Sequence, residues 1–405
     1  MGESGSSTQT MLTQVGRGGE SSLQYVNPPI VRGTTVLAQT LEQWRQRAKL
    51  PFNAKPQANY GRFGTLTTAA FESAIAELEG AYKSFCFPSG LAACTHSLLA
   101  VCKPGSHALL TDFVYWPLRE FAENVLTQLG VEVEFFTSQN TADVLSRFKE
   151  NTCALYLEAP GSISFEMCEV DELAYAAHQR GAIVLMDNTW ATPLLFKPLE
   201  HGVDISIQSV SKYIGGHSDC IMGVASCTEK AWELLSNSVT RFGQTASPDD
   251  LYQALRGLRT LDVRLRQHGQ SALSVARWLE AQPEVQRVCC PGLESHPGHA
   301  TFKRLFRGVS GLFSFVFEPM PEEKLAMFFD SLRIVGIGLS WGGFESLVVP
   351  LVARPASQIH DDYPKEGQLV RIHVGLENIE DLINDLQQAF VLMRHYEPKT
   401  EHGMV

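Results

Sequence analysis

Lys212 follows an apolar segment that ends in two hydroxyl side chains. Residues 205–216 read ISIQSVSKYIGG, so Ser209 and Ser211 come just before the lysine. A lysine at the mouth of a buried strand is costly unless it is exposed, paired or chemically used, because burial disfavours the charged amine. An amine whose pKa is lowered in this way is suited to Schiff-base formation with an aldehyde. From this segment alone, an ordinary surface lysine at a strand end remains an open interpretation.

Two further segments could hold charged parts of a ligand. Asp187 closes the apolar run IVLMD, and the carboxyl ends of parallel strands border the ligand crevice. A buried carboxylate there needs a cationic partner, such as a pyridinium nitrogen, or it caps the next turn. In FCFPSGLAAC, residues 85–94, a strand, a Pro-Ser-Gly turn and a helix would aim the amides of Gly90 and Leu91 at an anion. A plain strand-to-helix turn is the alternative.

The three segments are compatible with one cofactor. Lys212 would take an aldehyde, and Asp187 would pair with a protonated ring nitrogen. A phosphate would be held by helix amides and strand-end hydroxyls, namely Gly90, Leu91, Ser209 and Ser211. Together these groups describe pyridoxal 5′-phosphate, which we predict to be the cofactor.

Alternating strands and helices are needed to position these groups. Apolar runs predict strands at 84–87, 107–110, 131–136, 154–158, 183–187, 205–209 and 221–226. The clearest helices between them are predicted at 90–101 and 170–179. Continuously apolar strands that alternate with helices favour a mostly parallel sheet covered on both faces. The predicted fold class is therefore α/β.

The pattern differs at both ends of the chain. Residues 1–59 are polar and interrupted by proline, which predicts an extended N-terminal arm with one short helix near 41–49 and a flexible leader of about ten residues. Beyond residue 260, strands are predicted at 311–317 and 369–375, and apolar residues recur at helical spacing from 379 to 390. We predict a cofactor-binding large domain at 60–260 and a smaller α/β domain at 261–405.

Composition excludes several classes of protein. The chain has 33 Lys and Arg against 44 Asp and Glu, which argues against nucleic-acid binding. No apolar run is long enough for a membrane helix, and the first residues do not resemble a signal peptide. The nine cysteines lie mainly in apolar segments, which predicts reduced thiols in a cytoplasmic protein. The histidines show no ligand spacing, so no metal is expected, and His217 is interpreted as a structural hydrogen-bonding residue.

The order of the motifs resembles the Cys/Met-metabolism family of fold-type I pyridoxal-phosphate enzymes. The resemblance runs from about residue 26 to 390 and includes NYGRFGTLT, ELEG, FPSGLAA, EAPGS, MDNTWA, SVSKYIGGHSD, LRGLRTLDVRLRQH, SGLFSFVF, SWGGFESL and RIHVGLE. It implies the transferase fold of that class, in which a mostly parallel seven-stranded sheet lies between helices and a smaller C-terminal domain follows. It also implies an amino-acid substrate and a homotetramer built from dimers with shared active sites, in which the arm contacts the neighbouring subunit.

The resemblance assigns a role to each matching residue. Lys212 would carry the cofactor and move the Cα proton of the substrate, while Asp187 would keep the ring nitrogen protonated. Tyr115 would stack on the ring as a third catalytic residue, and Arg371 would bind the substrate carboxylate by a bidentate fork. Other residues would complete the phosphate site from the neighbouring subunit or line the substrate pocket: Tyr60, Arg62, Leu339, Ser340 and Trp341. Core aromatic residues and an internal ion pair are the alternatives for the two tyrosines and Arg371.

Two local signatures favour the β-lyase branch of the family. These are EAPGS at 158–162 and Trp341 in SWGG, and they imply cleavage of L-cystathionine to L-homocysteine, pyruvate and ammonia. Leu339 and Trp116 depart from the family pattern, and a more apolar pocket suits a less polar substrate. The alternatives are another carbon–sulfur lyase acting on cysteine- or methionine-type substrates, or γ- or β-elimination from an unusual γ-substituted, for example halogenated, amino acid. A non-catalytic descendant is disfavoured because the residue set is intact.

Overall fold

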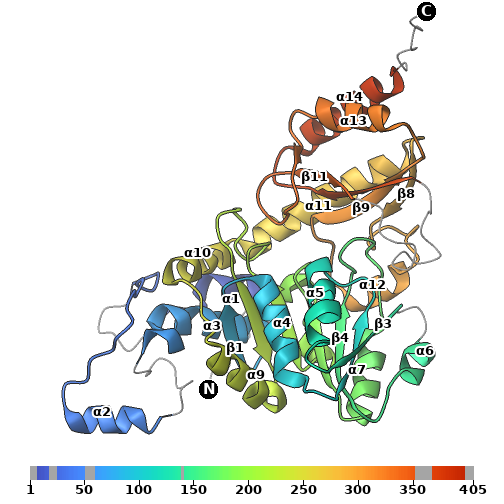
Figure 1. Ribbon diagram of the computed structural model, residues 1–405. Helices are drawn as coiled ribbons and strands as arrows, with labels where there is room; N and C mark the ends of the chain where they lie inside the picture. Colours follow the sequence, from blue (N-terminus) through green and yellow to red (C-terminus); the bar gives the residue numbers. More distant parts are fainter. Residues whose placement is uncertain (1–6, 18–24, 51–59, 138–140, 352–366, 397–405) are drawn as a thin grey trace, which may run out of the picture.

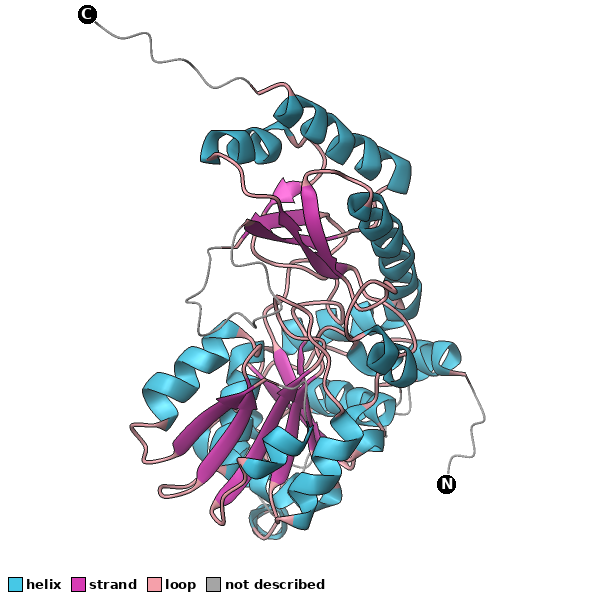
Figure 2. Ribbon diagram, turned by 90° about the vertical axis from the view of Figure 1, so that its right-hand side faces the viewer, coloured by secondary structure: helices cyan, strands magenta, loops and turns pink. Residues whose placement is uncertain are grey.

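The computed structural model describes residues 7–17, 25–50, 60–137, 141–351 and 367–396. Two β-sheets lie one above the other, with helices packed against their faces (Figure 1, Figure 2). Parts of the predicted N-terminal arm, namely residues 1–6, 18–24 and 51–59, lie outside the described residues.

The larger sheet contains all seven strands that the apolar runs predict. They are β1 (Lys83–Phe87), β2 (His107–Thr111), β3 (Glu132–Phe136), β4 (Thr152–Glu158), β5 (Ile183–Asp187), β6 (Ile205–Ser209) and β7 (Gly223–Cys227). Their spatial order is β1-β7-β6-β5-β4-β2-β3. Strands β2 to β6 pair in parallel, whereas β7 is antiparallel to both of its neighbours. The expectation of a mostly parallel sheet is confirmed.

Strand β7 begins at Gly223 rather than at Ile221, where the apolar run starts. The backbone of Met222 instead forms hydrogen bonds with the amide and hydroxyl of Ser211. The two residues before Gly223 therefore belong to the loop beside Lys212, and the prediction of a strand start at Ile221 was wrong.

Alternate residues of the central strands face two different layers of helices. On β6, Ile205 and Ile207 join one apolar cluster with α4 (Gly90–Val101) and α9 (Glu229–Phe242). On β5, Val184 and Met186 join a second cluster with α7 (Val170–Gln179). Both faces are covered, and this is why the strands read as continuous apolar runs. The other helices of this region are α3 (Leu66–Glu79), α5 (Trp116–Phe121), α6 (Thr141–Ser146), α8 (Thr192–Leu195) and α10 (Pro248–Arg259).

The described part of the N-terminal region holds two helices instead of one. Helix α2 (Leu41–Ala48) lies where the sequence predicts it. Helix α1 (Thr8–Gln14) was not predicted, and its Leu12 joins an apolar cluster with residues of α3 and α10. The expected flexible leader is therefore wrong for residues 8–10, because burial of Leu12 offsets the cost of ordering this segment.

The smaller sheet has five strands, and sequence patterns predicted two of them. Its order is β10 (Gly336–Ile337), β11 (Leu347–Pro350), β12 (Gln368–His373), β9 (Leu312–Phe317) and β8 (Val285–Cys289). The predicted strands correspond to β9 and β12, which pair antiparallel. Accompanying helices are α11 (Leu261–Glu280), α12 (His299–Leu305), α13 (Glu322–Ser331) and α14 (Ile379–Arg394).

One apolar core joins the two sheets. Leu157 and Met186 of the larger sheet share a cluster with Phe313 and Phe315 of the smaller one. Helix α11 begins next to the predicted boundary at residue 260, and the division into two domains stays a prediction. No helix of the described residues is long and apolar enough to cross a membrane.

Candidate active site

The predicted cofactor residues gather at the carboxyl edge of the larger sheet. Glu158, Asp187 and Ser209 are the last residues of β4, β5 and β6, which are neighbours in the sheet. Glu158 and Asp187 are paired in the strand register. Lys212 follows Ser209 after one turn, closed by a hydrogen bond of 3.1 Å from its amide to the Ser209 carbonyl. This edge is where ligands bind in open α/β sheets.

The Pro-Ser-Gly turn lies directly against the end of β6. A Cβ atom on Gly90 would come within 2.6 Å of both Cβ and Oγ of Ser209. The Ser89 hydroxyl caps α4 by accepting the Ala92 amide at 3.1 Å. Only glycine permits this approach, so the N-terminus of α4 and a strand-end hydroxyl border one small space. That arrangement fits a phosphate group.

Replacing Gly90 with alanine is expected to weaken cofactor binding at least about tenfold, because the new methyl group must displace Ser209. Fluorescence titration of the cofactor-free protein with pyridoxal 5′-phosphate measures the change. Gly308→Ala is a matched control, since its Cβ would meet only the end of the Leu195 side chain at 3.3 Å. Equal affinities of Gly90→Ala and the parent protein would contradict the assignment of this turn to the phosphate.

Asp187 is a buried carboxylate that is only partly satisfied by the protein. Its Oδ1 accepts hydrogen bonds from the amide and hydroxyl of Thr189, at 2.9 and 2.6 Å. Among the described residues, its Oδ2 accepts a hydrogen bond only from the weak thiol donor of Cys94, at 3.5 Å. Burial raises the pKa of Asp187, and the Thr189 hydrogen bonds oppose this rise. A cationic N–H group beside Oδ2 would stabilise the charged form, as a protonated pyridine would.

The amine of Lys212 lies beside the SWGG segment. Its Nζ donates to the Ser340 hydroxyl at 2.8 Å and lies 5.3 Å from the centre of the Trp341 ring. Burial, assisted by the positive charge of Arg371, lowers the pKa of Lys212 to about 8. At pH 7 the neutral amine is then roughly 300-fold more abundant than for an ordinary lysine.

Cofactor attachment to the cofactor-free protein is expected to depend on pH through this amine. The neutral amine is the nucleophile, so the rate should rise about tenfold from pH 6 to 7 and level off above about pH 8. Stopped-flow absorbance in the visible range follows the reaction. Arg371→Ala should move the midpoint upward, because a neighbouring positive charge is removed. A single midpoint near the ordinary lysine pKa of 10.5 would contradict this prediction.

Backbone packing fixes the SWGG segment against the lysine. Gly342 has φ of +88°, and a Cβ there would lie 2.8 Å from the carbonyl carbon of Lys212. Arg371 of β12 donates from Nη2 to the Leu339 carbonyl at 2.6 Å. The smaller sheet therefore delivers Arg371, Ser340 and Trp341 to the lysine at the carboxyl edge of the larger sheet.

Sequence patterns missed a buried group behind Lys212. The rings of Tyr213, His268 and His373 lie 5.1–5.9 Å apart, and Trp341 packs edge-on to Tyr213. Burial lowers the pKa of His268 to about 4 and that of His373 to about 3, so both are neutral. Arg264 donates to the Tyr213 carbonyl at 2.7 Å. The sequence offered one hint, since LRGLRTLDVRLRQH places polar residues at helical spacing. Spacing alone does not show whether that side of the helix is buried or exposed.

The remaining predicted site residues on this chain are Tyr115, Leu339, Trp116 and His217. The Tyr115 amide donates to Glu158 Oε2 at 2.6 Å, and Tyr115 is close enough to Cys94 and Asp187 for their charges to raise its pKa, together with burial as the largest cause. Leu339 is 72% exposed. Trp116 begins α5, and His217 contacts the Gly215 carbonyl at 2.8 Å.

Tyr60 and Arg62 are not brought to Lys212 of their own chain. Tyr60 forms an isolated bridge with Thr35, and Arg62 donates to the Thr240 carbonyl at 3.3 Å. Among the described residues, neither side chain forms a hydrogen bond with Lys212, Asp187 or Ser209. The described part of the chain also contains no group of three or more side chains arranged for a metal ion.

The α/β fold, with a lysine, a buried strand-end aspartate and a glycine-lined helix N-terminus at one sheet edge, fits the class of pyridoxal-phosphate enzymes of fold type I. The sequence comparison sets the family within this class. The family model for Cys/Met-metabolism PLP-dependent enzymes matches residues 9–391, and the chain belongs to this family. Pyridoxal phosphate is its cofactor.

Individual relatives cover nearly the whole chain. Cystathionine β-lyase of Escherichia coli is 39% identical over 94% of this chain and 97% of its own length. An L-alanine/L-glutamate racemase of Wolbachia pipientis is 37% identical over 97% of this chain and 99% of its own. The crystal structure of MetB from Corynebacterium glutamicum has a TM-score of 0.86 at 30% identity and covers 96% of this chain and 98% of its own.

Proposed function

We propose that this enzyme is a carbon–sulfur β-lyase that cleaves L-cystathionine to L-homocysteine, pyruvate and ammonia. The observation that carries the proposal is the position of Trp341, whose ring lies 5.3 Å from Lys212 Nζ while the same segment is bonded to Arg371. An indole beside the reacting amine offers an apolar wall for a thioether chain. The name of the Escherichia coli relative supports the same substrate.

The chain's own groups account for binding and proton movement. Bound pyridoxal phosphate supplies an electron sink for the pair released when the Cα–H bond breaks. Arg371, on a strand bonded on both sides, binds and orients the substrate carboxylate. Lys212 Nζ takes the Cα proton, since its lowered pKa leaves a neutral base near pH 8.

Asp187 and Tyr115 support the ring itself. Asp187 would hold a proton at the ring nitrogen, since Oδ2 is left to accept it while Thr189 fixes Oδ1. Tyr115 would stack against the ring, and the hydrogen bond from its amide to Glu158 fixes the backbone from which its side chain extends. Trp341 and Tyr213 exclude water behind the amine.

The product set of the cofactor-loaded enzyme tests this proposal. With L-cystathionine, we expect pyruvate and homocysteine in equal amounts, at a rate well above that with L-cysteine. Production of 2-oxobutyrate would instead favour γ-elimination, to which the exposed apolar Leu339 would be suited with a γ-substituted or halogenated amino acid. Chiral analysis after incubation with L-alanine tests racemisation, the activity that names the Wolbachia relative. D-Alanine with no pyruvate from cystathionine would overturn the lyase assignment.

The proposal includes shared active sites in a homotetramer built from dimers. Tyr60 and Arg62 lie on a segment bonded to residues 34 and 35 of the N-terminal region, and they would reach the phosphate of the neighbouring subunit. The division into an arm at 1–59, a large domain at 60–260 and a small domain at 261–405 belongs to the same proposal. So does a cytoplasmic location, which the nine free thiols support.

Mixed dimers test the shared sites. Arg62→Ala and Lys212→Ala should each be nearly inactive, whereas a mixture after subunit exchange should regain about one quarter of the parent activity, because one site in each hybrid dimer is intact. Exchange is verified by mass spectrometry of differently tagged subunits. Hybrids without activity would show that Arg62 serves its own subunit.

A further inference from the structure

Cys102 and Cys153 form a thiol pair at the edge of the sheet opposite to Lys212. Their sulfur atoms lie 3.8 Å apart. Cys102 is the C-cap residue directly after α4, and Cys153 is the second residue of β4. The candidate active site lies at the other ends of these two elements, so its chemistry does not account for the pair.

A bulge in the sheet turns Cys153 toward Cys102. His107 pairs with Thr152 and Ala108 with Ala154, so Cys153 is an extra residue between two register positions of β4. Bulges redirect a side chain in this way. Cys153 is the one partly exposed cysteine of nine; the other eight, Cys102 included, are buried. Cys153 is thus the more exposed residue of the pair.

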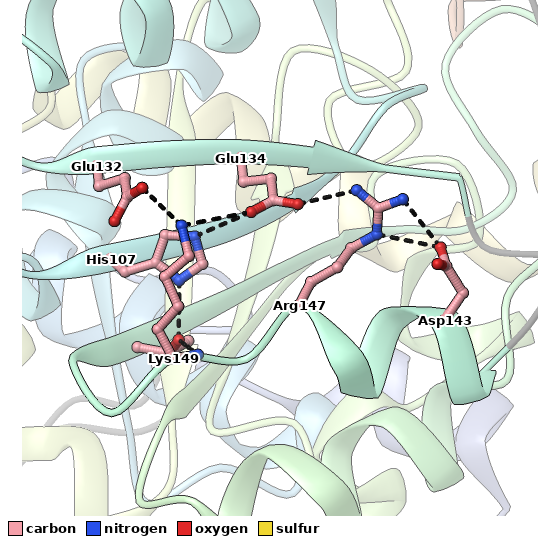
Figure 3. A network of polar contacts seen from close by, with 7 residues as sticks. His107, Glu132, Glu134, Asp143, Arg147 and Lys149 are labelled. Atoms are coloured by element: carbon pink, nitrogen blue, oxygen red, sulfur yellow. Dashed lines mark hydrogen bonds and ion pairs between the residues drawn. The ribbon is translucent and has the colours of Figure 1, made fainter.

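Polar contacts hold the strand ends around this bulge (Figure 3). His107 Nδ1 is 2.8 Å from the Thr152 hydroxyl, and Lys149 forms an ion pair with Glu132. Glu134 joins Lys149 to Arg147, which in turn bonds Asp143 of α6. The start of β4, where Cys153 lies, is thus fixed to β2 and β3.

The surroundings favour the reactive form of one thiol. The hydrogen bond with Cys102 is the main cause that lowers the pKa of Cys153 to about 7, against the opposing effect of burial, and Ser106 and Lys103 act in the same direction. The same bond raises the pKa of Cys102. Cys153 is also the more exposed residue of the two, and on both grounds we assign it as the attacking thiolate and Cys102 as the thiol that follows.

We propose that Cys102 and Cys153 form a reversible modification site at which a peroxide oxidises both thiols to a disulfide. The Cys153 thiolate attacks the peroxide, so an S–O bond forms and the O–O bond breaks. Hydroxide or alkoxide leaves and takes a proton from solvent to give water or an alcohol. The Cys102 sulfur then displaces the hydroxyl group from Cys153, so an S–S bond forms and the S–O bond breaks, with loss of water. Two electrons pass from the thiols to the peroxide. Closure needs the sulfurs to move from 3.8 Å to about 2 Å apart.

The test uses the reduced, cofactor-loaded enzyme treated with hydrogen peroxide. Free thiols are then blocked with N-ethylmaleimide, and tryptic peptides are analysed without reduction. We expect a cross-link between the peptides 84–119 and 150–180, lost on treatment with dithiothreitol. The oxidised protein should also unfold at a higher temperature, because the bond closes a long loop.

Variants assign the bond, since these peptides also contain Cys86, Cys94 and Cys168. Cys102→Ser and Cys153→Ser should each abolish the cross-link, whereas the buried control Cys168→Ser should retain it. In Cys102→Ser, Cys153 should instead be oxidised to the sulfinic acid. A cross-link that survives in Cys153→Ser would overturn the proposal. The proposal would also be overturned if, in the parent enzyme, Cys153 were oxidised to the sulfinic acid while Cys102 remained a free thiol and was alkylated by N-ethylmaleimide.

Discussion

Replacing Lys212 with alanine is expected to lower kcat at least about 10³-fold, which corresponds to about 4 kcal/mol of transition-state stabilisation. The amine lies 2.8 Å from the Ser340 hydroxyl, and no second lysine lies within hydrogen-bonding distance of that group among the described residues. Its removal deletes both the point of cofactor attachment and the base for the Cα proton. Steady-state pyruvate formation gives the rate, and the visible absorbance of the bound cofactor should be lost or strongly shifted.

Two controls separate chemistry from structure in this experiment. Ser340→Ala removes only the partner of Nζ, so it should retain the absorbance band and lose far less activity. Lys303→Ala, on the exposed side of α12, should behave like the parent.

Exogenous methylamine should restore part of the rate of Lys212→Ala by supplying an amine to the vacated space. A variant that keeps more than about a tenth of the parent kcat would show that another group moves the proton.

Replacing Asp187 with asparagine is expected to lower kcat about 10²- to 10³-fold while the cofactor-free protein stays equally or more stable. Asparagine Oδ1 can still accept from Thr189, whereas its amide replaces Oδ2 and cannot hold a proton on the ring nitrogen. The two effects have opposite signs because burial raises the pKa of Asp187. A carboxyl whose pKa is raised in the folded state destabilises that state at pH values above its unfolded pKa.

Thermal unfolding of the cofactor-free proteins at pH 7 and pH 4 measures the effect on stability. The advantage of Asp187→Asn over the parent should shrink at pH 4, where the parent carboxyl is protonated in part. Cofactor addition should raise the unfolding temperature of the parent more than that of the variant, since the ring cation compensates only a charged partner. A variant with near-parent kcat would remove Asp187 from the reaction.

Sequence patterns predicted the larger sheet well because its strands are buried on both faces. Runs such as those ending at Asp187 and Ser209 are continuously apolar, and this pattern is hard to imitate elsewhere. The strands β8, β10 and β11 were missed. β10 has only two residues, and β11 is exposed in part, so neither carries a period that the sequence could show. Helix α1 was missed because its polar residues outnumber the single buried Leu12.

The sequence by itself determined which chemistry is available. Lys212, Asp187 and the Pro-Ser-Gly turn each close or open a local element, so strand and helix signals sufficed to place them at one edge. Only the tertiary structure decided what surrounds the amine. Ser340 and Arg371 are 128 and 159 positions from Lys212 and reach it through a second sheet, and the lowered pKa of Lys212 arises from that burial and that positive charge. Local patterns do not encode desolvation by distant segments, and so the reactivity of the lysine, the neutral histidines behind it and the contact between Cys102 and Cys153 emerge only when the chain is folded.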